Sequence, residues 1–290
     1  MIDPESRIFH LHLVSDATGE TLEAMAKAAL VQFEGVEARK HLWPMIRTPT
    51  QMRRTMDFIA ENPGLVLYTL VNEELRRVLT RRCSLLGIPH VSVLDPVIEG
   101  LGQFLGARAR GLPGRQHEMD ADYFERIDAL HFTMAHDDGQ LVKDLTTADI
   151  ILVGVSRTSK TPTSIYLANK GFKTANVPFV PGVPLPPELD EPLAALIVGL
   201  TAAPERLVEI RANRLRAMRE SPSTTYVDEA KVREEVLACR RLCAAHGWPV
   251  IDVTRRSIEE TAAAIVKLYT MREAETAEAA SEGGEPGTRD

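Results

Sequence analysis

The chain has 290 residues, of which 44% are hydrophobic and 26% are charged, and its formal net charge is −7. This balance is typical of an ordinary globular protein. No apolar stretch reaches the length of a membrane span, and residues 1–6 (MIDPES) lack the basic and apolar pattern of a secretory signal. We therefore expect a cytoplasmic protein that does not bind a membrane.

The negative charge is concentrated at the C-terminus. Residues 273–290 contain six acidic residues and one arginine, which accounts for −5 of the total charge of −7. The rest of the chain carries only −2, so a basic surface for nucleic acid is not indicated. The composition of residues 273–290 predicts a disordered acidic tail.

Two of the three cysteines, Cys239 and Cys243, stand four residues apart in a stretch with a helical pattern. They would share one face of the helix. A pair of metal ligands is one interpretation, but two small buried side chains are favoured.

The first half of the chain alternates short apolar runs with helical patterns. This order predicts a Rossmann-like α/β domain, in which helices cover both faces of a parallel sheet. We expect strands at residues 8–14, 42–46, 65–71 and 90–94, and helices at 24–33, 50–61 and 73–86. Residues 108–115 (RARGLPGR) interrupt the pattern as a loop or linker. A helix near 122–127, a strand at 129–134 and a turn at 137–139 are expected next, and the domain is expected to span residues 1–145.

The second half repeats the alternation and predicts a P-loop kinase-like α/β domain over residues 146–272. We expect strands at residues 149–155, 174–180, 196–200 and 249–254, and helices at 161–170 and 204–219. A longer helix capped by Asp228 is expected to end at Gly247, and a capping box at residues 257–260 (SIEE) predicts the start of a last helix.

The junction after the 149–155 strand contains the residues of a phosphate-binding loop. Residues 154–161 (GVSRTSKT) match the nucleotide-binding pattern G-x4-G-K-[ST], except that Ser159 replaces the second glycine. In such a loop the backbone N–H groups hold phosphate, the lysine reaches the terminal phosphates, and the last hydroxyl binds Mg²⁺. We expect Lys160 to be catalytic and Thr161 to be the metal ligand. The expected nucleotide-binding residues are Gly154, Val155, Ser156, Arg157, Thr158, Ser159, Lys160 and Thr161.

The alternative to a nucleotide site is a turn rich in serine and threonine with a solvated Lys160. The Cβ of Ser159 would crowd a phosphate, although its hydroxyl would be able to donate to one. The order of strand, loop and helix favours nucleotide binding. Arg211 and Arg214, in the 204–219 stretch, are candidates to cover the phosphates, against the alternative of a solvated basic face.

A second pattern for anion binding follows the first strand. Thr18, Gly19 and Thr21 open a helix whose N-terminus would favour an anion, and Asp16 is a candidate base or Mg²⁺ ligand. A capped turn without a ligand explains the same residues equally well.

Two further groups of polar residues are expected to be structural. Asp137 and Asp138 are interpreted as a turn rather than as catalytic carboxylates. His10 and His12 alternate on one strand face, where half-buried histidines are commoner than a metal pair that lacks a third ligand.

Four stretches of the sequence are distinctive: residues 14–21 (VSDATGET), 123–127 (YFERI) with 136–139 (HDDG), 153–162 (VGVSRTSKTP) and 166–171 (YLANKG). In these stretches the chain resembles the regulatory proteins of pyruvate, phosphate dikinase and of phosphoenolpyruvate synthase, over about residues 7–272. A serine at position 159 is that family's own form of the loop. The acidic tail lies outside the family pattern.

The resemblance implies a bifunctional serine/threonine kinase and phosphorylase. Such an enzyme phosphorylates a threonine of the dikinase with ADP, and removes that phosphate with inorganic phosphate, releasing pyrophosphate. It implies that residues 154–161 bind ADP, and the loop pattern itself predicts Mg²⁺ at Thr161. Inorganic phosphate would use the same loop or the turn at Thr18, Gly19 and Thr21. The alternatives are the same chemistry on phosphoenolpyruvate synthase, and a module that binds ADP without catalysis. The sequence leaves the oligomeric state open, a homodimer included.

Overall fold

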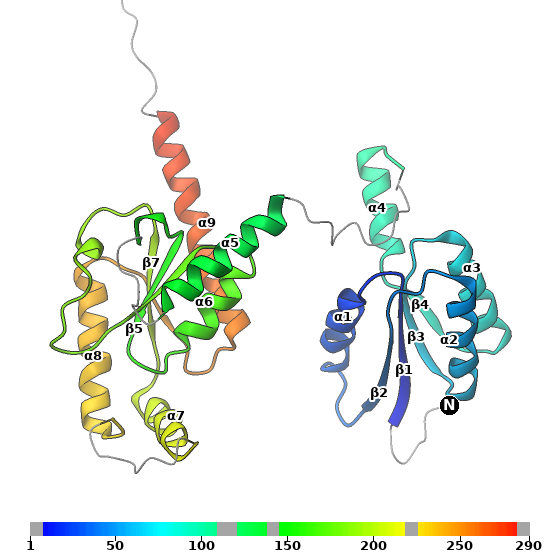
Figure 1. Cartoon of the computed structure of the whole chain (residues 1–290), viewed down its shortest axis with the longest axis horizontal. Helices are drawn as coiled ribbons and strands as arrows, with labels where there is room; N and C mark the ends of the chain where they lie inside the picture. The colour runs from blue at the N-terminus through cyan, green and yellow to red at the C-terminus, as the bar shows by residue number, and fades with distance from the viewer. Residues whose placement is uncertain (1–7, 109–120, 138–144, 218–225, 283–290) are drawn as a thin grey trace, which may run out of the picture. The chain divides into compact units, whose positions relative to one another are not determined.

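A computed structural model describes residues 8–108, 121–137, 145–217 and 226–282 of the chain. The chain forms two units, Met1–Glu118 and Met119–Asp290. Each unit contains a four-stranded parallel sheet, so the predicted α/β architecture of two successive parallel-sheet domains is confirmed (Figure 1). Among the described residues, no helix is long and apolar enough to span a membrane.

The N-terminal unit is a sheet with the strand order β2-β1-β3-β4. Its elements are β1 (Ile8–Ser15), α1 (Glu20–Leu30), β2 (Glu37–Trp43), α2 (Pro49–Glu61), β3 (Gly64–Thr69), α3 (Glu73–Leu85), β4 (His90–Ser92) and α4 (Asp95–Leu105). Alternate residues of β1 point to opposite faces. Leu11 and Leu13 pack against α1, whereas Val14 joins the core beneath α2 and α3.

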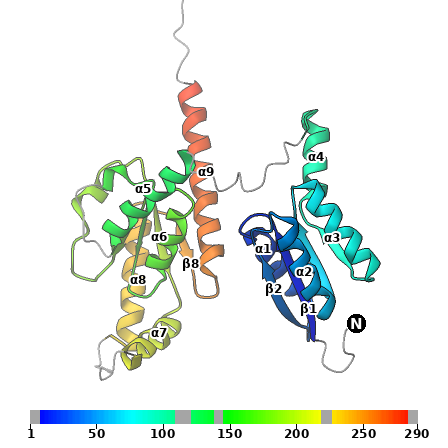
Figure 2. The ribbon, with the colours of Figure 1, turned by 45° about the vertical axis from the view of Figure 1, so that its right-hand side comes forward.

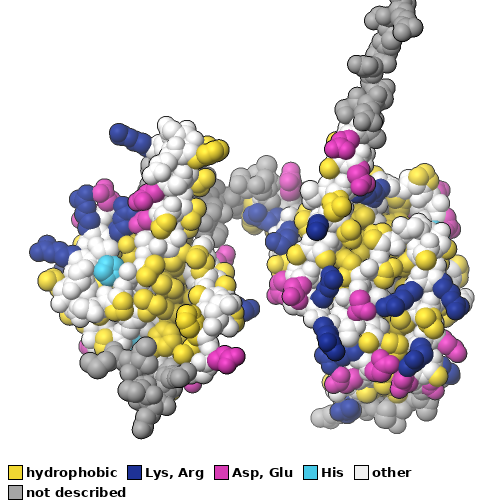
Figure 3. Space-filling model, turned by 180° about the vertical axis from the view of Figure 1, so that it is seen from behind, with side chains coloured by type: hydrophobic (Ala, Val, Ile, Leu, Met, Phe, Trp, Pro, Cys, Tyr) yellow, Lys and Arg dark blue, Asp and Glu magenta, His cyan; other side chains and the backbone are white. Residues whose placement is uncertain are grey.

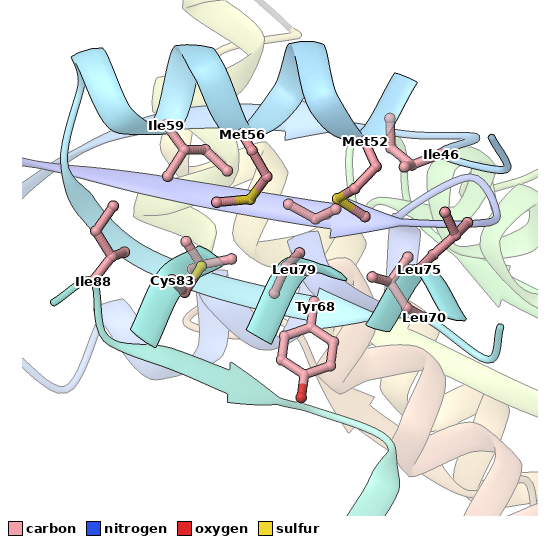
Figure 4. Packing of buried hydrophobic residues seen from close by; sticks show 12 residues of the cluster. Ile46, Met52, Met56, Ile59, Tyr68, Leu70, Leu75, Leu79, Cys83 and Ile88 are labelled. Atoms are coloured by element: carbon pink, nitrogen blue, oxygen red, sulfur yellow. The ribbon is translucent and has the colours of Figure 1, made fainter. Parts of the chain in front are cut away.

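The larger core of this unit lies between the sheet and the helices α2 and α3 (Figure 4). Met52, Met56 and Ile59 of α2 face Leu75 and Leu79 of α3, and all five side chains are buried. The helix α2 begins with a capping box, in which Thr48 and Gln51 satisfy each other's backbone N–H groups. Hydrophobic side chains also gather on the surface of the N-terminal unit in the view from behind (Figure 3).

The C-terminal unit is a sheet with the strand order β6-β5-β7-β8. Its elements are α5 (Ala121–Ala135), β5 (Ile150–Gly154), α6 (Lys160–Ala168), β6 (Thr174–Pro178), β7 (Leu196–Thr201), α7 (Pro204–Ala217), α8 (Glu229–Ala245), β8 (Val250–Asp252) and α9 (Ile258–Glu282), with short 3₁₀ turns at Leu145–Thr147 and Pro187–Asp190. The helices α6 and α9 cover one face of the sheet, and α8 covers the other (Figures 1 and 2).

Most predicted elements of the C-terminal unit are confirmed, including its caps. Asp228 accepts a hydrogen bond from the N–H of Lys231 at the start of α8. Ser257 and Glu260 form the predicted capping box before α9. All five residues of β5 are buried, as expected for a central strand of a parallel sheet.

The strand expected at residues 129–134 is wrong, because this stretch belongs to the helix α5. Its apolar residues alternate in the sequence, but the side chains that are buried, Ala129, Thr133 and His136, follow the helical spacing. Since α5 packs against β6 and α6, the boundary between the units lies before α5 rather than near residue 145.

Two other expectations need correction. The strand expected at 42–46 is β2, which begins at Glu37; it is an edge strand with many exposed charged residues, so apolar content does not mark its start. The tail expected to be disordered from residue 273 is helical as far as Glu282, the end of α9. Its alanines and glutamates are strong helix formers. Residues 283–290 lie outside the described part of the chain.

Candidate functional site

The 154–161 loop connects the buried strand β5 to the start of α6. Two of its residues that are not glycine, Arg157 and Ser159, have positive φ angles of 71° and 60°. This left-handed conformation costs an L-residue roughly 1–2 kcal/mol. Where right-handed and left-handed residues alternate along the backbone, successive N–H groups point into a common hollow, which is a typical anion site. The loop therefore has a strained backbone of the kind found in anion-binding turns.

Gly154 is the one position of the loop where the structure leaves no room for a side chain. A Cβ built on Gly154 would lie 2.5 Å from the carbonyl oxygen of Leu200 and 2.9 Å from Oγ1 of Thr158. Ser159, in contrast, is exposed. The serine that replaces the second glycine of the general pattern therefore fits without a clash, although its backbone is held in the left-handed conformation.

Lys160 is buried across the loop rather than solvated. Its side chain is 6% exposed, and Nζ donates a hydrogen bond of 3.1 Å to the carbonyl oxygen of Val155. The hydroxyl of Thr158 donates to the same oxygen at 3.0 Å. A buried ammonium group held against the backbone of the loop is suited to neutralise an anion bound there, which favours the phosphate-binding interpretation over a plain turn with a solvated lysine.

Thr161 lies beside the carboxylate of Asp137, a residue that the sequence pattern assigns to a turn. Its hydroxyl donates to Oδ1 of Asp137 at 2.9 Å, and the amide of Asn176 donates to the same Oδ1 at 2.6 Å. Asp137 follows the end of α5, and Asn176 is a buried residue of β6. Asp138 lies outside the described residues. The structure thus places an acidic group at the expected metal ligand, which sequence spacing did not reveal.

The two candidate arginines of α7 differ sharply. Arg214 is exposed, whereas Arg211 is 1% exposed and forms an ion pair of 2.7 Å with Glu235 of α8. Arg211 also donates to the carbonyl oxygen of Ser156 at 3.3 Å and to that of Tyr226 at 3.1 Å. Arg211 therefore connects the 154–161 loop to α7 and α8, and its buried guanidinium is held by Glu235 and by two backbone carbonyl groups.

Tyr226 lies against the outer part of the loop. Its hydroxyl is 3.1 Å from Oγ of Ser156 and accepts a hydrogen bond of 3.4 Å from Nε of Arg157. The guanidinium of Arg211 lies 4.7 Å from the ring centroid, a cation–π contact. Burial raises the pKa of the Tyr226 hydroxyl, but the hydrogen bonds from Ser156 and Arg157 and the two arginine charges bring that pKa below its ordinary value. Sequence patterns gave no signal for this residue.

Cys239 and Cys243 are buried, as predicted, and they belong to the same core cluster as Val155 of the loop. A hydrogen bond from the Cys243 thiol lowers the pKa of Cys239, and the charge of Lys160 adds to this effect. The pKa of Cys243 is raised by the same contact and by burial.

The turn after β1 belongs to the N-terminal unit and is stabilised by hydrogen bonds to the backbone that follows β3. Oδ2 of Asp16 accepts hydrogen bonds from the N–H of Val71 at 2.7 Å and of Asn72 at 3.4 Å, and Asp16 is buried. Gly19 has a φ of 89° and is the N-cap residue of α1, so no side chain at the cap position itself bonds to the first N–H groups of this helix. Thr18 is exposed and Thr21 is half-buried. The structure therefore assigns Asp16 a role in fixing the start of α3.

The histidines of β1 form a stack with a third histidine. The rings of His10, His12 and His41 are nearly parallel, with centroids 4.8 to 6.2 Å apart. Nδ1 of His10 lies 2.8 Å from Nε2 of His41. Within the described residues, no group of three or more His, Cys, Asp or Glu side chains is arranged to hold a metal. Nε2 of His12 contacts the carbonyl oxygen of Asn62 at 2.8 Å, and Nδ1 accepts from the indole of Trp43 at 3.4 Å. Both contacts fit the neutral ring with its proton on Nε2.

Comparison with known proteins adds to this geometry. The family model described as kinase/pyrophosphorylase matches residues 11–266. A relative from Rhizorhabdus wittichii is 58% identical over 91% of this chain and 97% of its own length, and one from Novosphingobium aromaticivorans is 56% identical over 96% and 98%. A third, from Bradyrhizobium diazoefficiens, is 53% identical over 91% and 95%. All three are named as pyruvate, phosphate dikinase regulatory proteins. The chain therefore belongs to the kinase/pyrophosphorylase family.

Proposed function

We propose that this protein regulates pyruvate, phosphate dikinase by two opposed phosphoryl transfers. In one direction the β-phosphoryl group of ADP passes to a threonine hydroxyl of the dikinase, leaving AMP. In the other, inorganic phosphate takes the phosphoryl group from the phosphothreonine, which frees the threonine and forms pyrophosphate. The names of the relatives support the dikinase as the target, rather than phosphoenolpyruvate synthase.

The observation that carries this proposal is the buried ammonium of Lys160 inside the 154–161 loop. Phosphoryl transfer requires mainly that the reacting groups be positioned and that their charge be neutralised. The backbone of the loop would hold the diphosphate of ADP, and Lys160 would move from the carbonyl oxygen of Val155 to a phosphate oxygen. The hydroxyl of Thr161 and the carboxylate of Asp137 are oxygen ligands of the kind that Mg²⁺ prefers. Bound Mg²⁺ would supply charge neutralisation.

The attacking threonine hydroxyl must also give its proton to a base. Asp16 is the proposed base, and the turn at Thr18, Gly19 and Thr21 is a proposed second anion site. One oxygen of Asp16 already accepts two backbone hydrogen bonds, so the other would have to accept the proton. Replacement of Asp16 by Ala, with both reactions assayed, tests this role, and unchanged rates in both directions dismiss it.

A labelling experiment tests the function as a whole. The purified protein is mixed with pyruvate, phosphate dikinase and β-³²P-labelled ADP, and labelled threonine in the dikinase is measured. The reverse mixture contains phosphorylated dikinase and inorganic phosphate, and released pyrophosphate is measured. Parallel mixtures contain phosphoenolpyruvate synthase. Transfer to the synthase alone would reassign the target, and ADP binding without any transfer would leave only a sensing module.

A matched pair of variants connects the activity to the loop. Lys160→Met removes the ammonium and keeps a side chain of similar length. Lys170→Met makes the same change at an exposed lysine just beyond α6. We expect threonine labelling to disappear in the first variant and to remain in the second. Normal labelling by folded Lys160→Met would refute the assignment of the loop.

A further inference from the structure

The carboxylate of Asp137 lies where negative charge would oppose nucleotide binding. Its Oδ1 accepts hydrogen bonds from Thr161, the last residue of the 154–161 loop, and from Asn176. In loops of this pattern the last hydroxyl lies next to the terminal phosphates of the nucleotide. A carboxylate and a phosphate at such a short separation repel each other. A divalent cation between them would turn this repulsion into attraction.

The strands on either side of the loop offer no other carboxylate for that cation. Nucleotide-binding proteins with this loop commonly hold Mg²⁺ with the loop hydroxyl and an aspartate outside the loop. In this chain β6 and β7 flank β5, and their sequences, TANVP and LIVGLT, contain no acidic residue. The helix α5 approaches from outside the sheet, packs on β6 and α6, and delivers Asp137 to Thr161.

The surroundings of Asp137 hold its carboxylate in one position. The N–H of Asn176 donates to the carbonyl oxygen of His136, the residue before Asp137, at 3.0 Å. The side-chain amide of Asn176 then binds Asp137 itself, and it also lies 3.1 Å from Oγ1 of Thr161. Asn176 is 1% exposed, so this arrangement is anchored in the sheet. One carboxylate and one hydroxyl, completed by water and phosphate oxygens, match the way proteins usually bind Mg²⁺.

We propose that Asp137 and Thr161 together form the Mg²⁺ site of the nucleotide-binding loop, with Asn176 as the residue that positions the carboxylate. This inference rests on the proposed function, because it assumes that ADP binds at the 154–161 loop. It assigns Asp137 to metal-linked binding of the nucleotide and not to proton transfer.

The test is the affinity for ADP with and without Mg²⁺, measured by calorimetry on the full chain. In the unchanged protein, Mg²⁺ tightens ADP binding by about tenfold or more, as expected for one charge-assisted contact. Asp137→Asn keeps the shape and an acceptor for Thr161 but removes the charge. In this variant the effect of Mg²⁺ on ADP affinity falls to about twofold or less, while ADP without Mg²⁺ binds as tightly as before or more tightly, because the repulsion is gone. Mn²⁺ bound with ADP, followed by electron paramagnetic resonance, is lost in parallel.

The matched control is Asp149→Asn at the opposite end of β5, where the carboxylate accepts a hydrogen bond from the N–H of Lys173. We expect this control variant to keep the tenfold effect of Mg²⁺ on the affinity for ADP. An Asp137→Asn protein that retains the tenfold Mg²⁺ effect overturns the metal site. Loss of ADP binding in both conditions also overturns it, since Asp137 would then support the loop rather than a cation. An unchanged protein that binds no ADP at all refutes the proposed function itself, which is a distinct result.

Discussion

Replacing Arg211 by Met is the sharpest test of how the 154–161 loop is held. Arg211 is 1% exposed, pairs with Glu235 at 2.7 Å, and donates to the backbone of Ser156 and Tyr226. The methionine fills a similar volume but leaves the Glu235 carboxylate without its ion pair. It also removes the donors that join the loop to α7 and α8. We therefore expect a loss of stability confined to the C-terminal unit.

The size of the loss follows from the burial of the two partners. Removing one partner of a fully buried ion pair costs about 3–5 kcal/mol. The side chain of Glu235 is 25% exposed, so water relieves part of its stranded charge. We therefore expect the lower end, about 3 kcal/mol, which corresponds to a fall of roughly 6–12 °C in the melting temperature for a unit of this size.

The two tryptophans of the chain allow the units to be followed separately. Trp43 belongs to the N-terminal unit and Trp248 to the C-terminal unit. In a Trp43→Phe background, the fluorescence of Trp248 during urea unfolding reports the C-terminal unit alone. The control is Arg233→Met on α8, because the ion pairs of Arg233 with Glu205 and Glu229 are about half exposed. We expect this control to change the unfolding free energy by less than about 1 kcal/mol.

A second substitution separates the stranded charge from the lost packing. Adding Glu235→Leu to Arg211→Met removes the unpaired carboxylate, so much of the lost stability should return. If Arg211→Met unfolds within about 1 kcal/mol of the unchanged protein, a surface-like value, then the pair does not hold the loop and the reasoning from burial fails.

Three further predictions concern the backbone of the loop, a close approach between strands, and the buried histidines. Ser159→Gly should raise the melting temperature of the C-terminal unit by about 2–4 °C. Relief of the left-handed strain is expected to exceed the entropy cost of the more flexible glycine by about 1 kcal/mol. A lower melting temperature would contradict the φ of 60° at this residue. Gly64→Ala should destabilise the N-terminal unit by at least about 3 kcal/mol in urea unfolding, since its Cβ would lie 2.0 Å from the carbonyl oxygen of His10; a near-neutral effect would show that β1 and β3 are not paired in this register. Burial, followed by repulsion from neighbouring histidines, lowers the pKa of His12, so the neutral ring stabilises the folded state above pH 6.5 and this contribution is lost as the pH falls below that value. Unfolding followed by Trp43 fluorescence in a Trp248→Phe background between pH 8 and 5 should show that decline, and His12→Gln should flatten it.

Features that depend on local chemistry could be predicted from the order and types of the residues alone. The capping residues Asp228 and Ser257, the buried run of β5 and the order of strands and helices follow from residue types and spacing over a few positions. The order of elements also identified the 154–161 loop, because a strand, a short loop and a helix are contiguous in the chain. Two local patterns predicted the wrong structure. Alternating apolar residues predicted a strand where α5 is a helix, and the acidic composition of the tail predicted disorder where α9 continues.

The distant groups that complete the candidate site are brought together by packing and could not be predicted from local patterns. Thr161 meets Asp137, which is 24 residues earlier, and Ser156 meets Arg211, which is 55 residues later. Neither pair has a fixed spacing in the sequence, because each depends on how helices pack on the sheet. In the sequence, an aspartate after a helix is typical of a turn, and an arginine in a basic helix is typical of a solvated face. Packing instead places each of these two residues against the loop. Burial then changes their energetics, since a charge removed from water must find a partner or a ligand.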